Sequence, residues 1–476
     1  MKQKIKPKQP RYFFSGKKIL LVGLGRLGGG LAMAKFLILH KAKLTITDML
    51  LPSELKDGLK KLKGQKIKFT LGEHKAEDFL KADYIIFNQA VSIYSKWPKF
   101  IIKNKKKYFN NLTLFLELTK NTTRPVIAVT GTRGKTTITT WLSHFIPQPI
   151  TGGNTPNSDL FKIIDQSAPN NSPFIIEMPS HQLEYIKKGL APPHIAVITN
   201  LYEDHLDRYG DMKTYRAVKK RIFLNQTKKD FLVLNNDNKN TKIFLSKKPK
   251  SQLYFFSLTK LPLNKDGLFF ENDSLYMQNQ KKRVLVTKLN NFTPHQRQNL
   301  LASLLTAYLF GRSWKDLIQK INALPAVPFR QQIIYQTDSL TIINDSAATS
   351  PDATIAGITS MKKFGNNLLL ITGGTDKKLG YKNLAKKIAS SLKGKNIFFL
   401  NGSATDKLLN ELKKIKYFRY QPQVFSNLKD ILFAVKQKKM PKKAILFSPG
   451  GSSFEKFKNE FDRGEQFNKL SIKIFG

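Results

Sequence analysis

The residue types best suited to chemistry gather in one short glycine-rich stretch. The run Gly-Thr-Arg-Gly-Lys-Thr-Thr at 131–137 follows a β-branched segment at 126–129, which predicts a buried parallel strand. A strand that passes through a glycine-rich turn into a helix presents backbone N–H groups and the helix dipole to an anion. Lys135 adds a positive charge, and the Thr136 hydroxyl is a ligand type for Mg²⁺. We therefore predict an ATP-phosphate site made by Gly131, Thr132, Arg133, Gly134, Lys135, Thr136 and Thr137. The usual P-loop has a further glycine where this chain has Val129, so an ordinary glycine-containing turn is the alternative.

A second glycine-rich turn lies near the N-terminus. The pattern G-x-G-x-x-G, formed by Gly23, Gly25 and Gly28, separates a predicted strand from an apolar helix. The next strand, at 43–47, ends at Asp48, where dinucleotide-binding units place an acidic residue. These glycines predict close approach to a diphosphate, and Asp48 predicts a contact to a ribose or base. Taken alone, the pattern predicts NAD or another nucleotide diphosphate, and a turn without ligand is the alternative.

Side chains able to bind a metal ion follow the turn at 131–137. Glu177 ends a predicted strand at 174–177, and His205 lies in a polar loop after the next strand. Lys219 lies on a predicted helix at 215–223. A carboxylate and an imidazole at neighbouring strand ends are suited to hold one or two Mg²⁺ beside phosphates. Each residue alone also has a structural explanation, as a strand-end cap or a surface histidine.

The elements that would position these groups alternate between strands and helices. Strands are predicted at 18–22, 43–47, 84–88, 126–129, 174–177, 195–199, 333–336, 340–344, 368–372, 397–401 and 444–448, and helices at 31–39, 215–223 and 294–309. Such alternation predicts an α/β fold of parallel, right-handed units. Polar loops at 344–349, 373–378 and 448–453 follow strands of the last third, and ligands bind at such edges.

Length and boundary signals divide the chain into three predicted domains. A length of 476 residues is enough for about three hydrophobic cores. A polar stretch at 103–123 and a proline-punctuated linker at 323–328 indicate the boundaries. We predict a Rossmann-like domain at 1–109, a central P-loop ATPase-like parallel sheet at 110–325 and a second Rossmann-like domain at 326–476.

Composition narrows the class of protein. The chain has no cysteine, so disulfides and Cys-ligated zinc are excluded. The basic start lacks the apolar core of a signal peptide, and no window is apolar enough to span a membrane. We therefore expect a cytoplasmic protein without membrane insertion. The net charge is +48; nucleic-acid binding is one interpretation, but the lysines are spread over the whole chain, as an AT-rich genome would encode.

Nine motifs follow one another along the chain: TGTRGKTT at 130–137, GGNTP at 152–156, EMPSHQLE at 177–184, NLYEDHLDRYG at 200–210, YRAVKKRIF at 215–223, VPFR at 327–330, INDSAAT at 343–349, GGTDKK at 373–378 and SPGGSSFEKFKNEFDRG at 448–464. In these motifs and their order, over nearly its whole length, the sequence resembles the Mur ligases, ATP-dependent enzymes of peptidoglycan synthesis, and within them the D-glutamate-adding members.

The resemblance implies a substrate for each domain: UDP-N-acetylmuramoyl-L-alanine, ATP and D-glutamate, with no specific nucleic acid and a monomeric protein. It implies catalytic roles for Lys135, Lys219, His205 and Glu177, and a Mg²⁺ site made by Thr136, Glu177, His205 and a carbamylated Lys219. It assigns Asn299, Arg330 and Asp345 to ATP, Gly23, Gly25, Gly28, Asp48 and Asn154 to the UDP substrate, and Lys377, Ser453 and Phe454 to the amino acid. The chemistry implied is phosphorylation of the substrate carboxylate to an acyl phosphate, followed by attack of the amine.

Three single positions and one short segment depart from the family pattern. Ala347 replaces a lysine, Glu460 replaces an aromatic residue, and Gln296 replaces an asparagine. The segment Asn88-Gln89-Ala90 replaces Ser-Pro-Gly. The departures at 347 and 460 leave open a ligase for another amino acid. A basic nucleic-acid-binding relative without catalysis is a further alternative, as is an NAD-dependent oxidoreductase, which would rest on the N-terminal glycines alone.

Overall fold

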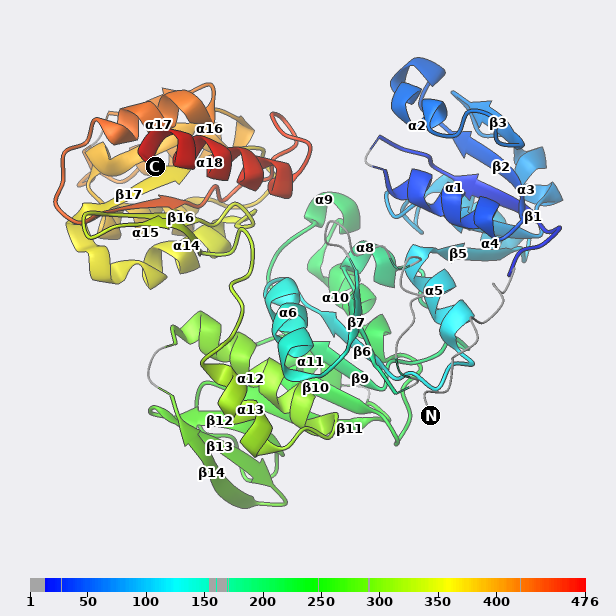
Figure 1. Ribbon diagram of the computed structural model, residues 1–476, viewed down its shortest axis with the longest axis horizontal. Helices are drawn as coiled ribbons and strands as arrows, with labels where there is room; N and C mark the ends of the chain where they lie inside the picture. The colour runs from blue at the N-terminus through cyan, green and yellow to red at the C-terminus, as the bar shows by residue number, and fades with distance from the viewer. Residues whose placement is uncertain are drawn as a thin grey trace, which may run out of the picture. The chain divides into compact units, whose positions relative to one another are not determined.

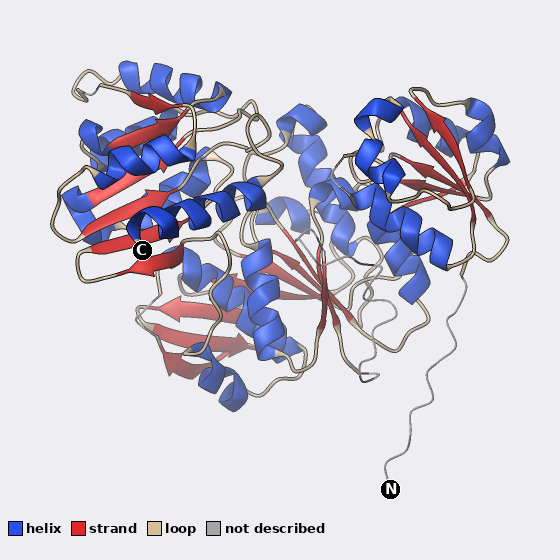
Figure 2. Ribbon diagram, turned by 45° about the horizontal axis from the view of Figure 1, so that its top comes forward, coloured by secondary structure: helices blue, strands red, loops and turns tan. Residues whose placement is uncertain are grey.

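The computed structural model describes residues 13–26, 28–153, 160, 169, 171–246, 248–289, 292–419 and 421–476. The described residues form three β-sheets with flanking helices (Figures 1 and 2). They separate into two compact units: Met1–Asn200, Arg216–Lys288 and Leu300–Lys320 form the first, and Leu201–Tyr215, Leu289–Asn299 and Ile321–Gly476 form the second. None of the helices in the described part of the chain has the length and apolarity that crossing a membrane requires.

The N-terminal sheet has five parallel strands in the order β3-β2-β1-β4-β5. These are β1 (Lys18–Val22), β2 (Lys43–Asp48), β3 (Ile67–Leu71), β4 (Tyr84–Phe87) and β5 (Lys107–Asn110). The helices are α1 (Gly29–Leu39), α2 (Lys56–Lys60), α3 (Ala76–Lys81), α4 (Lys96–Lys103) and α5 (Asn111–Thr119), with the 3₁₀ helix η1 (Pro52–Glu54). The apolar run of β1 is buried on both faces: one core contains α1 residues and the other contains residues of α3 and α4. The predicted boundary stretch at 103–123 thus contains β5 and α5.

The central sheet has nine strands in the order β14-β13-β12-β11-β10-β9-β6-β8-β7. These are β6 (Val126–Thr130), β7 (Ile150–Gly152), β8 (Phe174–Glu177), β9 (Ile195–Ile198), β10 (Phe231–Asn235), β11 (Gln252–Ser257), β12 (Gly267–Glu271), β13 (Ser274–Asn279) and β14 (Lys282–Lys288). Helices of this region are α6 (Lys135–Phe145), α8 (Ser180–Leu183), α9 (Leu206–Tyr209), α10 (Met212–Lys220), η2 (Arg221–Phe223), α11 (Thr241–Leu245), α12 (Pro294–Leu309) and α13 (Trp314–Ile321). Strand β6 pairs in parallel with both β8 and β9, so the carboxyl ends of these three strands meet at one edge.

The third sheet has six strands in the order β15-β16-β20-β17-β18-β19. These are β15 (Gln332–Gln336), β16 (Leu340–Asn344), β17 (Leu368–Thr372), β18 (Ile397–Leu400), β19 (Gln423–Phe425) and β20 (Lys443–Phe447). The helices are α14 (Pro351–Ser360), η3 (Lys362–Asn367), α15 (Lys382–Ser391), η4 (Gly394–Asn396), α16 (Ser403–Lys413), α17 (Leu428–Lys436) and α18 (Glu460–Phe475). One face packs on α14, α15 and α16, and the other on α17 and α18. The expectation of parallel units was wrong for β15, which runs antiparallel to β16, because the turn between them is too short for a crossover.

Candidate active site

The turn between β6 and α6 is closely packed against the end of β9. Gly131 has φ 149°, and a Cβ added there would lie 1.9 Å from the Thr199 Oγ1 atom. Gly134 has φ 82° and is the N-cap of α6. The first turn of a helix has N–H groups without acceptors in the helix, and the helix dipole adds positive potential there. The turn therefore has the backbone geometry of an anion site.

Asn200 holds this turn in place, a role that the sequence motif did not reveal. The Arg133 N–H donates to Asn200 Oδ1 at 2.9 Å, and the Thr132 N–H donates to the Asn200 carbonyl at 3.0 Å. The Thr199 hydroxyl donates to the Arg133 carbonyl at 2.5 Å. These two amides are thus engaged by the protein, and the anion-binding geometry is concentrated at the first turn of α6.

Lys135 supplies the positive charge of the turn. Its Nζ donates to the carbonyl oxygens of Gly131 and Thr132, each at 3.2 Å. The side chain is half-buried and curls back over the residues that precede it. An ammonium group held on the phosphate-binding turn is placed to neutralise a phosphate.

Thr136 and Glu177 bring a hydroxyl and a carboxylate together at the same sheet edge. The Thr136 hydroxyl donates to Glu177 Oε2 at 2.7 Å. Glu177 is buried and lies opposite Val129 in the β6–β8 register. Mg²⁺ prefers oxygen ligands and is commonly held by one or two carboxylates together with substrate phosphates and water, so this pair fits the ion. Among the described residues, no group of three or more His, Cys, Asp or Glu side chains is arranged to hold a metal.

Lys219, on α10, supports the phosphate turn as a hydrogen-bond donor. Its side chain is only 1% exposed, and Nζ donates to Thr130 Oγ1 and to the Gly131 carbonyl, each at 3.0 Å. These two hydrogen bonds tie the end of β6 and the start of the turn to α10. The structure thus brings Lys135, Thr136, Glu177 and Lys219 together around one turn, while carbamylation of Lys219 stays a prediction.

His205 belongs to the second compact unit and precedes α9. It has φ 55°, its Nε2 lies 3.8 Å from Asp204 Oδ2, and its ring centroid is 6.2 Å from that of Tyr215. Asp204 Oδ1 also lies 3.8 Å from Lys377 Nζ. Lys377 donates to the Thr349 hydroxyl at 3.3 Å. The predicted amino-acid contact Lys377 is therefore joined to the loop that carries His205.

Asp345 and Arg330 lie together at the start of the third sheet. Asp345 accepts hydrogen bonds from the Ser448 hydroxyl at 2.9 Å and from the Gln331 N–H at 3.1 Å. Burial raises the pKa of this carboxyl from 3.8 to about 7, although the Ser448 hydrogen bond, the Gln331 N–H and the Arg330 charge act in the opposite direction. Asn299, the third residue predicted to contact ATP, is buried on α12.

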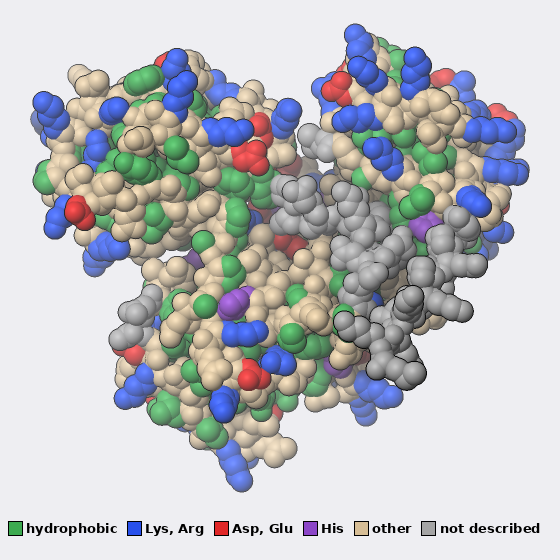
Figure 3. Space-filling view, in the orientation of Figure 1, with side chains coloured by type: hydrophobic (Ala, Val, Ile, Leu, Met, Phe, Trp, Pro, Cys, Tyr) green, Lys and Arg blue, Asp and Glu red, His purple; other side chains and the backbone are tan. Residues whose placement is uncertain are grey.

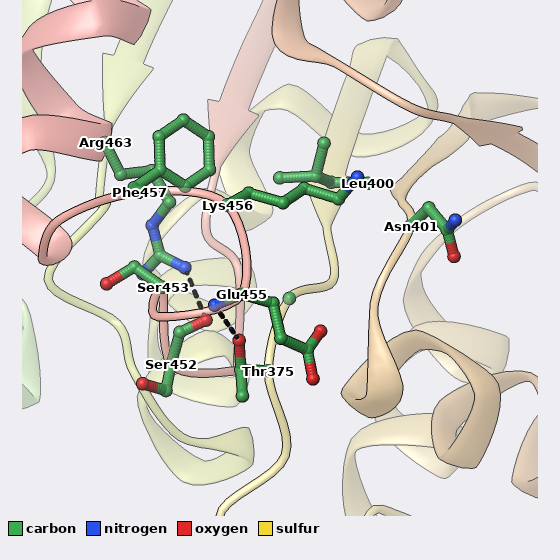
Figure 4. Close-up of a pocket in the computed structure, with 10 residues that line it drawn as sticks. Thr375, Leu400, Asn401, Ser452, Ser453, Glu455, Lys456, Phe457 and Arg463 are labelled. Carbon is green, nitrogen blue, oxygen red and sulfur yellow. Dashed lines mark hydrogen bonds between the residues drawn. The ribbon is translucent and has the colours of Figure 1, made fainter. Parts of the chain in front are cut away.

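A small pocket lies at the carboxyl edge of the third sheet (Figure 4). It is lined by Gly374, Thr375, Leu400, Asn401, Ser452, Ser453, Glu455, Lys456, Phe457 and Arg463. Reciprocal backbone hydrogen bonds between Thr375 and Ser452, at 2.9 and 2.8 Å, join the loops after β17 and β20. The Ser453 hydroxyl is buried and has no hydrogen-bond partner among the described residues, whereas the Phe454 side chain is 62% exposed. An orphan buried hydroxyl is suited to a polar ligand.

Arg463 is the buried cation that ties these loops to the loop after β16. Its guanidinium donates to both oxygens of Ser346, at 3.1 and 2.7 Å, and to the carbonyls of Gly451 and Ser452, at 3.1 and 3.0 Å. Burial lowers the pKa of Arg463 to about 10. No role for Arg463 was predicted from the sequence, because its acceptors are backbone and hydroxyl oxygens brought together only by the fold.

The N-terminal turn has the left-handed backbone that its glycines predict. Gly23, Gly25 and Gly28 have φ values of 93°, 62° and 86°. Asp48 is buried, and its carboxylate accepts hydrogen bonds from the N–H groups of Gly25 and Leu50, each at 2.9 Å. Asp48 thus holds the turn itself in this structure. The predicted contact Asn154 lies outside the described residues.

The glycine that allows the closest packing of α1 is one that the fingerprint did not single out. A Cβ added at Gly30 would lie 2.4 Å from the Gly23 carbonyl oxygen and 2.3 Å from that of Leu24. A side chain at this position would push the first turn of α1 away from the end of β1. The signal in the sequence was the Gly28-Gly29-Gly30 run, which the spacing rule alone does not interpret.

Comparisons with known proteins agree with this arrangement. Residues 129–307 match the Mur ligase middle domain. The UDP-N-acetylmuramoylalanine–D-glutamate ligase of Roseiflexus sp. (strain RS-1) is 31% identical over 473 residues, covering 96% of this chain and 98% of that protein. The ligase of the same name from Borreliella afzelii (strain PKo) is 33% identical over 463 residues, covering 95% of this chain and 96% of its own.

Solved structures share the fold at low sequence identity. The MurF ligase of Thermotoga maritima in complex with ADP has a TM-score of 0.58 at 15% identity, covering 98% of this chain and 96% of that one. The UDP-N-acetylmuramate–alanine ligase MurC of the same organism has a TM-score of 0.57 at 18% identity, covering 96% and 99%. Fold and site together define a three-domain α/β protein with a nucleotide-phosphate turn in its central sheet. The chain belongs to the Mur ligase family.

Proposed function

We propose that this protein joins D-glutamate to UDP-N-acetylmuramoyl-L-alanine, with cleavage of ATP to ADP and phosphate, in peptidoglycan precursor synthesis. Relatives that carry the name of this activity match nearly the whole chain. The observation that carries the proposal is the Thr136–Glu177 contact of 2.7 Å beside the glycine turn, because it puts a hydroxyl and a carboxylate where a triphosphate and its cation would meet.

The proposed reaction has two steps. The L-alanine carboxylate attacks the γ-phosphorus of ATP, so that an oxygen–phosphorus bond forms and the bond to ADP breaks. Lys135 and the first-turn amides of α6 stabilise the charge on the transferring group. The D-glutamate amine then attacks the acyl phosphate carbonyl through a tetrahedral intermediate, loses a proton, and expels inorganic phosphate as the amide forms.

The proposed metal site has four ligands. Thr136 and Glu177 would hold Mg²⁺, which supplies charge neutralisation at the phosphates when bound. Carbamylated Lys219 and His205 complete the proposed set of ligands. What supports the role of Lys219 is its burial beside the turn, with Nζ 3.0 Å from the Gly131 carbonyl; a carbamate at this position would add oxygen ligands next to the phosphate turn.

The remaining contacts are proposed by domain. The turn of Gly23, Gly25 and Gly28, with Asp48, takes the UDP moiety within 1–109. Asn299, Arg330 and Asp345 contact ATP. Asn299 belongs to the central domain, 110–325, and the other two belong to 326–476. Lys377, Ser453 and Phe454 take D-glutamate within 326–476, as the orphan Ser453 hydroxyl and the half-buried Lys377 ammonium suggest for a carboxylate ligand. We further propose a cytoplasmic monomer with no specific nucleic-acid partner.

Phosphate release tests this function. Purified protein is mixed with ATP, Mg²⁺ and UDP-N-acetylmuramoyl-L-alanine, and each amino acid is added in turn. Release that depends on D-glutamate supports the proposal. Release only with another amino acid would assign the chain to a different member of the family, and release with none would contradict ligase activity.

A further inference from the structure

The segment Asn88-Gln89-Ala90, which follows β4, directly supports the N-terminal glycine turn. Asn88 Nδ2 donates to the Gly23 carbonyl at 3.0 Å. A Cβ added at Gly23 would lie 3.0 Å from the Asn88 Cβ, so the two backbones are packed as closely as glycine permits. Movement of this segment would therefore move the turn to which we assign the UDP moiety.

The next residue, Gln89, reaches a different part of the first unit. Its Oε1 accepts a hydrogen bond from Gln182 Nε2 at 3.0 Å and lies 3.3 Å from His181 Nε2. Both partners are on α8, which begins three residues after Glu177, the end of β8. Adjacent side chains of one short segment, Asn88 and Gln89, thus contact the N-terminal glycine turn and the helix that follows the Glu177 strand.

The buried carboxamide oxygen of Gln182 accepts no hydrogen bond from the residues that the structure describes. The residue is 3% exposed, and its Oε1 has no hydrogen-bond partner within the described part of the chain. Its Nε2 is engaged by Gln89, and its carbonyl accepts from Asn110 Nδ2 at 2.8 Å. Because an unsatisfied buried amide oxygen is unfavourable, a fixed and unpaired Oε1 indicates a hydrogen-bond donor supplied by a ligand.

Other contacts hold the same two segments together without Gln89. The Ile93 N–H donates to Glu184 Oε2 at 3.1 Å, and the Tyr185 hydroxyl donates to the Val91 carbonyl at 3.0 Å. Glu184 and Tyr185 are fully or almost fully buried, and Tyr185 belongs to the apolar core shared with the N-terminal sheet. Loss of the Gln89 carboxamide should therefore leave the fold intact.

We propose that Gln89 is a positioning residue for the sugar-nucleotide substrate. It fixes the Gln182 carboxamide so that Oε1 accepts a hydrogen bond from an N–H or O–H group of the sugar portion, and it joins α8 to the segment whose Asn88 supports the UDP-binding turn. This inference rests on the proposed function for the identity of the substrate. Gln89 exerts this effect through its Oε1 atom, which accepts the hydrogen bond from Gln182 Nε2.

Two variants separate positioning from a structural role. Gln89→Leu replaces the carboxamide with an apolar group and removes the acceptor, whereas Gln89→Glu keeps acceptor oxygens; Gln65→Leu, at an exposed glutamine of the same sheet domain, is the control. We expect Gln89→Leu to raise the KM for UDP-N-acetylmuramoyl-L-alanine by about five- to tenfold, the loss of one buried hydrogen bond. The KM values for ATP and D-glutamate and the melting temperature should stay at wild-type values, and Gln89→Glu should recover most of the loss. Gln182→Leu alone and combined with Gln89→Leu should have the same effect, because Gln89 acts through Gln182.

The proposal is overturned if Gln89→Leu leaves the sugar-nucleotide KM unchanged, raises all three KM values alike, or lowers the melting temperature as much as the KM rises. A readout without turnover separates this inference from the proposed function. The rise in melting temperature on adding UDP-N-acetylmuramoyl-L-alanine alone should be smaller in Gln89→Leu than in wild type. If wild type releases no phosphate with D-glutamate, the proposed function fails while this shift still tests Gln89; no shift in wild type contradicts both.

Discussion

The two lysines of the central site are both hydrogen-bonded to the backbone of a single turn. Lys135 and Lys219 both donate to the Gly131 carbonyl, and Thr136 links the helix after the turn to Glu177. These side chains therefore all lie at the turn between β6 and α6.

Lys135→Ala should sharply reduce turnover and leave the fold intact. The lost ammonium group removes charge stabilisation of the transferring phosphoryl group, so we expect kcat to fall by about a hundred- to a thousandfold. Phosphate release and far-UV circular dichroism measure the two effects. Lys188→Ala, at an exposed lysine of the same domain, is the control, and near-normal turnover in Lys135→Ala would contradict the assigned role.

Lys219→Ala tests whether carbamylation supplies a metal ligand. If it does, the variant should lose most activity and regain part of it with added acetate or formate, which place a carboxylate in the vacated space. Lys213→Ala, on the exposed side of the same helix, should respond to neither change. Full activity without additive would remove the carbamate, and loss without rescue would leave Lys219 as the amine donor seen here.

Asp345 should make the third sheet less stable as pH rises toward neutrality. Its folded pKa of about 7 lies above the ordinary 3.8, so the folded state binds the proton more tightly than the unfolded state. The stabilisation is therefore complete below about pH 4 and lost as pH rises through 7, on the order of 4 kcal/mol. Hydrogen exchange of β16 and β20 amides, corrected for intrinsic rates, should show this slope in wild type and not in Asp345→Asn. Equal slopes would show that the carboxyl titrates normally.

At the scale of elements, the β6–turn–α6 unit depends on the close approach of Gly131 to β9. Gly131→Ala should distort the turn, because its Cβ would lie 1.9 Å from Thr199 Oγ1, and we expect kcat to fall by about a hundredfold. Gly189→Ala is a matched control: it also has positive φ, but nothing lies within 4 Å of the added Cβ. It should cost about 1 kcal/mol of stability and leave the KM for ATP unchanged. Equal losses in the two variants would mean that backbone strain, and not the packing of the turn, is responsible.

Elements with continuous apolar runs were predictable from the sequence. Strands β8, β16 and β17 and helix α12 begin and end at the predicted residues, because burial on both faces gives an unbroken pattern. Strand β3 was missed: its burial is partial, so it lacks such a run. The predicted direction of β15 was wrong, because the assumption of parallel units does not take the tight turn between β15 and β16 into account.

The strand–turn–helix unit of β6 and α6 was predictable, but the contacts that position its turn were not. The motif around Lys135 identified the residue types, whereas Asn200 and Gln89 act through partners 67 and 93 positions away. Periodicity and spacing report local backbone and say nothing of such long-range pairs. The same holds for Arg463, whose partner Ser346 is 117 residues away.

At the scale of the whole molecule, the excess of lysine and arginine over acidic residues is not concentrated on any one helix or sheet. Lysine and arginine side chains are scattered over the visible face in Figure 3 and do not gather over one sheet. The net charge of +48 should attract anionic substrates at low ionic strength. Binding to heparin or DNA should therefore vanish at moderate salt, without the sequence preference that a nucleic-acid-binding protein would show.

The most direct test of the central claim is to follow an oxygen label through the reaction. UDP-N-acetylmuramoyl-L-alanine is prepared with ¹⁸O in its L-alanine carboxylate and incubated with the protein, ATP, Mg²⁺ and D-glutamate, and the released phosphate is analysed by mass spectrometry. Attack of the carboxylate on the γ-phosphorus at the Lys135 turn predicts one ¹⁸O atom in each phosphate, with release dependent on D-glutamate. Unlabelled phosphate would show that water, and not the substrate carboxylate, accepts the phosphoryl group, and would contradict the account.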